Sequence, residues 1–144
     1  MSRTHKWDMA GAKVLGSAKV TISTATTTAF DFGTPDDINL NLNANYVKGD
    51  RVLVILTAST AGTTDSITWV INDAPDSSGS IGTPAAATCS FIQGALAAGT
   101  GDDYTVAAVE LQPNRPWLQC KVTHTGTTDT MVCHAVVLAI PSNL

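Results

Sequence analysis

The sequence predicts an all-β fold, a jelly-roll or Greek-key β-sandwich of about eight strands with an extended N-terminal arm. Charged residues make up only 14% of the 144 residues, and Glu110 is the single glutamate, although exposed helices are rich in Glu and Lys. Short stretches of alternating apolar and polar residues recur along the chain. Between these stretches Gly, Pro, Asp and Asn cluster, as turns require.

The length is typical of one domain, and the composition changes near the start of the chain. Residues 1–12 are polar and basic without a clear period, so we expect an N-terminal arm there. Residues 13–144 are expected to form a single β-sandwich domain. The expected strands are 18–24, 37–43, 51–59, 66–73, 88–93, 104–111, 117–125 and 128–140.

Four stretches of the sequence each indicate a particular local structure. Residues 37–43 alternate Ile or Leu with Asn, which predicts a half-buried strand. Residues 51–57 are apolar on both faces, which is typical of a central or interface strand. Residues 66–73 place two isoleucines and a tryptophan on one face. The GALAA stretch at 94–98 suits a single helical turn, where we expect the fold's helix to be confined.

The last two strands are expected to form a hairpin. A turn centred on Gly126 and Thr127 suits type II′ geometry, in which glycine takes the first central position. In that register Cys120 faces Cys133 on a buried, wholly apolar face. A disulfide between these two residues and a pair of reduced thiols both remain open, although three cysteines favour the thiols.

The opposite face of this hairpin would carry an exposed apolar surface. Trp117 would lie there beside Val136 and Leu138 and require a partner or a second sheet. The arm carries Arg and Trp, which are enriched in binding hot spots, although its tryptophan could equally pack on the sandwich itself. The interface residues that we expect are Arg3, Lys6, Trp7, Trp117, Val136 and Leu138.

No sequence pattern indicates an enzyme, and we expect no catalytic, cofactor-binding or metal site. The chain contains neither a G-x-S-x-G elbow nor a phosphate-binding loop. Zinc sites use closely spaced ligand pairs, whereas Cys89, Cys120 and Cys133 stand apart. Aspartates at 36–37, 73–76 and 102–103 leave a loop calcium site open, but Asp is also a routine turn former.

The charge and the hydropathy of the chain argue against nucleic acid and membrane as partners. The net charge of −4 and the pI near 5.0 disfavour nucleic acid, whose partners are usually basic. No apolar run approaches the ~20 residues of a membrane helix, and the start of the chain lacks the apolar segment of a signal peptide.

Three segments, 19–37, 48–76 and 114–139, resemble a group of small virion proteins of tailed bacteriophages. The first segment is similar to their opening strand and its Asp-x-Gly turn, and the second to their paired strands. The third is similar to their C-terminal hairpin, in which the chain crosses a Gly-Thr turn into an apolar last strand. This resemblance implies a capsid decoration, or cement, protein of the jelly-roll type.

Such a protein binds the outside of the major capsid shell as a dimer or trimer and stabilises contacts between capsomers. Its place is the virion surface, and it assembles in the host cytoplasm. An alternative is a carbohydrate- or receptor-binding β-sandwich of a phage fibre, which would need exposed aromatic residues. A small β-barrel enzyme ranks third, because it would need convergent His or carboxylate side chains in a pocket and the strand alternation places the three histidines apart.

Overall fold

A computed structural model describes residues 11–23, 26–31, 37–59, 66–83, 90–92, 96–97, 104–125 and 130–141. Strands are the only regular elements in these segments. The strands are β1 (Lys13–Ile22), β2 (Thr27–Ala29), β3 (Ile38–Asn39), β4 (Arg51–Ser59), β5 (Ser66–Ala74), β6 (Asp76–Ser77), β7 (Ser80–Ile81), β8 (Ser90–Ile92), β9 (Leu96–Ala97), β10 (Tyr104–Leu111), β11 (Trp117–Thr125) and β12 (Met131–Ile140).

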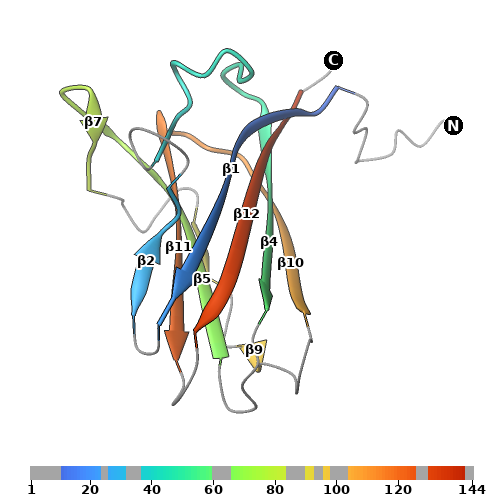
Figure 1. Ribbon diagram of the computed structural model, residues 1–144. Helices are drawn as coiled ribbons and strands as arrows, with labels where there is room; N and C mark the ends of the chain where they lie inside the picture. The colour runs from blue at the N-terminus through green and yellow to red at the C-terminus, as the bar shows by residue number, and fades with distance from the viewer. Residues whose placement is uncertain are drawn as a thin grey trace, which may run out of the picture.

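The strands form two antiparallel sheets that face each other (Figure 1). Sheet A has the order β1–β12–β4–β10, and sheet B has the order β2–β11–β5–β8. Two short strands extend sheet B, because β3 also pairs with β11 and β9 also pairs with β5. A separate small hairpin consists of β6 and β7.

The pairing of the eight major strands is that of a jelly roll. Counted along the chain, the first strand pairs with the eighth (β1 with β12), and the second pairs with the seventh (β2 with β11). The third pairs with the sixth (β4 with β10), and the fourth pairs with the fifth (β5 with β8). Nested pairs of this kind arise when one long antiparallel ribbon is rolled into two sheets. The predicted all-β sandwich is confirmed.

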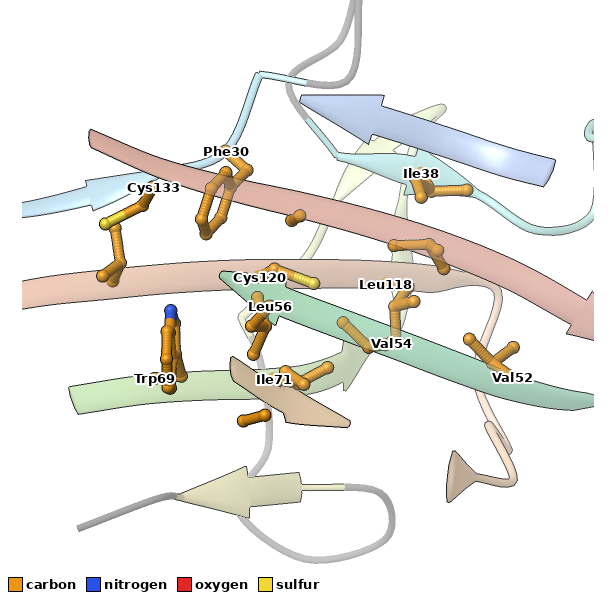
Figure 2. Close-up of a cluster of buried hydrophobic side chains, with 14 of the residues drawn as sticks. Phe30, Ile38, Val52, Val54, Leu56, Trp69, Ile71, Leu118, Cys120 and Cys133 are labelled. Carbon is orange, nitrogen blue, oxygen red and sulfur yellow. The ribbon is translucent and has the colours of Figure 1, made fainter. Parts of the chain in front are cut away.

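The core lies between the two sheets. Strand β4 is central in sheet A, as its two-sided apolar sequence predicted. Figure 2 shows Leu56 of β4, Trp69 of β5 and Cys120 of β11 within one cluster, and all three are fully buried. Alternate residues of β1, β4, β5, β11 and β12 supply most of this cluster, which also includes Ile22, Phe30, Val52, Val54, Ile71, Leu118, Val122, Met131, Cys133, Ala135 and Val137.

The predicted C-terminal hairpin is wrong. Strands β11 and β12 belong to different sheets, so Cys120 pairs with Ile71 of β5, whereas Cys133 pairs with Ala58 of β4. The inward face of each strand was nevertheless predicted correctly, because both cysteines are buried in the core. The predicted turn at 126–127 lies outside the described residues.

The predicted strand at 37–43 is reduced to the two residues of β3. The Asn39 side-chain oxygen accepts hydrogen bonds from the backbone N–H groups of Asn41 and Leu42, at 3.1 and 3.3 Å. Such a local bond gives the backbone an alternative to the sheet ladder. The chain therefore turns away after Asn39, and Leu42 is 82% exposed.

Three other sequence expectations have different outcomes. The helical turn expected at 94–98 is wrong where the chain is described, because residues 96–97 form β9. Strand β1 begins at Lys13, five residues earlier than expected. The N-terminal arm lies outside the described residues except for Gly11 and Ala12.

Neither Cys120 nor Cys133 is in a disulfide bond. Burial raises the pKa of the Cys133 thiol from 9.0 to about 11, so very little thiolate exists at pH 8. The thiolate is the reactive form, and each side chain is at most 1% exposed. We therefore expect neither cysteine to react with iodoacetamide in the folded protein at pH 8.

Peptide mapping by mass spectrometry measures this directly. Both cysteines should become labelled after denaturation, which is the matched control. Rapid labelling of either one in the folded protein would contradict its burial.

Candidate interaction surface

The outward side chains of sheet A form an apolar surface. They project away from the core because they alternate with its inward residues. The pairing places them in transverse rows, of which one joins Val14, Leu138 and Leu53. We call this surface the sheet A outer face and define it by Val14, Leu53, Ile55, Val106, Ala108, Val136 and Leu138.

The middle row of this surface spans all four strands. It runs from Ser17 of β1 through Val136 of β12 and Ile55 of β4 to Ala108 of β10. Val136 and Ile55 are half-buried, and the two end residues are exposed. Apolar side chains therefore lie next to one another across the sheet.

The exposure of individual residues shows how open this surface is. Val14 is 53% exposed and Val106 is 64% exposed, whereas Leu53 is only 6% exposed between its row neighbours. An exposed group of apolar side chains with a polar margin is typical of a protein-binding site. The sheet A outer face is thus the best candidate for a binding surface among the described residues.

Charged and polar side chains lie at its margins. At one corner Arg51 of β4 forms an ion pair with Glu110 of β10. In the row beyond Val136, Lys19 of β1 lies beside His134 of β12, and both are exposed. A partner is therefore expected to be apolar at its centre and to present acceptor or acidic groups near Lys19.

The other predicted surface residue, Trp117, is buried. It lies on the outward side of sheet B, where it is 1% exposed. Its indole N–H donates a hydrogen bond of 2.9 Å to Oδ1 of Asp76, at the start of the β6–β7 hairpin. Ser78 and Gly79 form the tip of this hairpin with φ values of 55° and 84°, as a type I′ turn requires.

The Asp76 carboxylate joins the hairpin to Trp117. The Gly79 N–H donates to Oδ2 of Asp76 at 3.0 Å. This backbone hydrogen bond, followed by the one from Trp117, holds the pKa of Asp76 below 3.8. Because the pKa of Asp76 is lowered in the folded state, the stabilisation from these hydrogen bonds is fully present at pH values above the unfolded-state pKa. It is lost as the pH falls through the lower folded-state pKa.

We expect the Asp76 carboxyl resonance to titrate with a midpoint below 3.8 in NMR spectra. The Trp117 indole N–H resonance should shift with the same midpoint, because it donates to that carboxylate. Asp76→Asn is the control and should abolish the indole titration. A midpoint at or above 3.8 would show that the carboxylate does not hold the hairpin.

The structure separates the residues that the sequence grouped as one surface. Val136 and Leu138 lie together on the sheet A outer face, but Trp117 lies on the other sheet. The expected cluster of these three residues is therefore wrong. It was predicted from a hairpin that the structure does not contain. Arg3, Lys6 and Trp7 lie outside the described residues.

Several residues of this surface were not predicted from the sequence. Val106 and Ala108 belong to a strand that is apolar on both faces, and that pattern was a signal for a second contact. Val14 was assigned to no strand. The β6–β7 hairpin lies between two expected strands, where a Ser-Gly pair is a turn signal.

Within the described part of the chain, no group of three or more His, Cys, Asp or Glu side chains could hold a metal ion. Its segments also include no helix long and apolar enough to cross a membrane. A scan against protein-family models and a search of curated proteins find no match to this chain.

Proposed function

We propose that this protein is a non-enzymatic virion component that binds the outside of a tailed-bacteriophage capsid and stabilises contacts between capsomers. The proposal rests on the sheet A outer face, because this face is an apolar surface suited to contact with another protein. The capsid as partner is inferred from the resemblance of segments 19–37, 48–76 and 114–139 to decoration proteins.

The physical properties of the chain suit this role. A jelly roll supplies a rigid scaffold, and a decoration protein binds many equivalent positions on one shell. Each contact therefore needs only modest affinity if copies are linked to one another, since linkage raises the effective concentration. Self-association as a dimer or trimer belongs to the same proposal, as do the arm residues Arg3, Lys6 and Trp7.

The described aromatic side chains favour this function over sugar binding. A glycan platform requires exposed aromatic rings. Phe30, Trp69 and Trp117 are buried, and Tyr46 is half-buried. None of these four rings is exposed as a glycan platform requires.

Co-sedimentation with empty shells tests the proposal. The shells are assembled from the major capsid protein encoded in the same genome, and shells of an unrelated phage serve as the control. We expect saturable binding to the first shells only. Folded protein that stays in the supernatant with both would refute the proposal, and binding on a glycan array would then favour the fibre-module alternative.

A further inference from the structure

The free edges of the two sheets differ in how they are protected. An edge strand exposes unpaired N–H and C=O groups that can pair with another chain. Proteins block such edges with very short strands, bulges, lysines, prolines or covering loops. Each edge of this sandwich can be compared with these devices.

The β1 edge of sheet A is protected in three ways. Its register with β12 shifts beside Leu15, which marks a bulge. The Asn43 side-chain amide donates to the Leu15 carbonyl at 3.0 Å, and that of Asn45 donates to the Val14 carbonyl at 2.9 Å. Lys19 adds an exposed charge further along the strand.

Both edges of sheet B are short. On one side β2 has three residues and β3 has two. On the other side β8 has three residues and β9 has two. None of these strands offers a ladder long enough for stable pairing with a second chain.

Within the described segments of the chain, strand β10 carries none of these devices. It pairs with β4 over all eight of its residues without a register shift. It contains no Lys, Arg or Pro, and its one charged residue, Glu110, is already paired with Arg51 of β4. Among the described residues β4 is its only partner, and it occupies the end of the sheet in Figure 1.

We infer that two copies of this chain associate through β10, antiparallel across a twofold axis, to make one continuous sheet across the dimer. In an antiparallel ladder only alternate residues exchange hydrogen bonds with a given neighbour. The remaining N–H and C=O groups of β10 therefore point outward. This inference rests on the self-association in the proposed function and specifies its surface and symmetry.

A second copy suits this edge better than a different partner. Twofold pairing closes both identical edges at once and leaves no further edge to propagate. It also opposes no like charges, since a register centred on Ala107 places Glu110 opposite Tyr104. Val106 of one copy would then lie opposite Ala108 of the other copy, so two exposed apolar side chains would meet.

The mass and the amide protection of the full-length protein test this inference. Sedimentation equilibrium should show a concentration-dependent dimer of the 14.9-kDa chain. Hydrogen exchange should show alternate amides of β10 gaining protection as the dimer forms, while β1 amides stay unchanged. A trimer, a monomer at every concentration, or protection elsewhere than β10 would overturn it.

Lysine substitutions at exposed positions give a second test. Val106→Lys/Ala108→Lys places at least one lysine opposite another in any twofold register centred on residues 106–108. We expect it to weaken dimerisation at least about tenfold. Ser17→Lys/Thr21→Lys adds the same charge on β1, where both positions are exposed, and should leave the dimer intact.

Val136→Lys separates this inference from the proposed function. It alters the sheet A outer face on an inner strand, so it should preserve the dimer. If the unmodified protein forms the dimer but does not bind shells, the edge inference stands and capsid docking is refuted. Loss of the dimer in Val136→Lys or in the β1 variant would overturn pairing through β10.

Discussion

Trp69→Ala is expected to lower the free energy of unfolding by about 3–5 kcal/mol. Trp69 is fully buried on β5 and belongs to the cluster between the sheets, with Leu56 of β4 nearby (Figure 2). Truncation removes a large apolar surface and leaves a cavity that two hydrogen-bonded sheets cannot close. Because domains of this size are stable by ~5–15 kcal/mol, this loss approaches global unfolding. Urea denaturation followed by circular dichroism measures it.

Trp69→Phe is the matched variant. The Trp69 indole N–H is buried and has no hydrogen-bond partner among the described residues. Phenylalanine removes this donor, and relief of a penalty of about 1–3 kcal/mol offsets part of the lost volume. We expect a much smaller effect than for alanine. A Trp69→Ala protein that loses less than ~1 kcal/mol would contradict the position of Trp69 at the centre of the core.

Val136→Lys is expected to weaken binding to capsid shells by at least about tenfold. Val136 lies in the middle row of the sheet A outer face, between Ser17 and Ile55. Docking would bury the new ammonium group without a partner, which is costly. In the free protein the lysine chain can extend to solvent, so the fold should be retained. Co-sedimentation with shells over a concentration series gives the affinity.

Thr68→Lys is the control on the opposite sheet. Thr68 of β5 pairs with Thr123 of β11 and is half-buried on the outward side of sheet B. It carries the same added charge on the face that the proposed contact does not use. Equal losses of shell binding in the two variants would point to a general charge effect and not to the sheet A outer face.

Alternation in the sequence predicted which side chains face the core, but it could not predict which strands pair. Cys120 and Cys133 both point inward, and they would do so in a hairpin or in two strands that cross between sheets. The two arrangements bury the same alternate residues, so the binary pattern cannot distinguish them. Pairing depends on the long-range nesting of strands, and here Cys120 lies opposite Ile71.

Side-chain hydrogen bonds explain two further differences between the predicted and the observed structure. The Asn39 side chain ends β3 by accepting backbone hydrogen bonds, although its flanking residues alternate as in a strand. The burial of Trp117 was not predicted, because its hydrogen-bond partner Asp76 lies far from it in the chain. The candidate surface could be predicted only in part, since Val136 and Leu138 gain their neighbours Ile55 and Leu53 by sheet pairing.

Hydroxyl-radical footprinting of shell-bound protein can show which face of the sandwich docks on the capsid. The method compares the oxidation of each side chain in free and bound protein. If the sheet A outer face docks on the capsid, Val106 and Leu138 should lose reactivity on binding, while Lys121 and Thr123 on sheet B should not. Protection of the sheet B pair with an unchanged sheet A outer face would contradict this account.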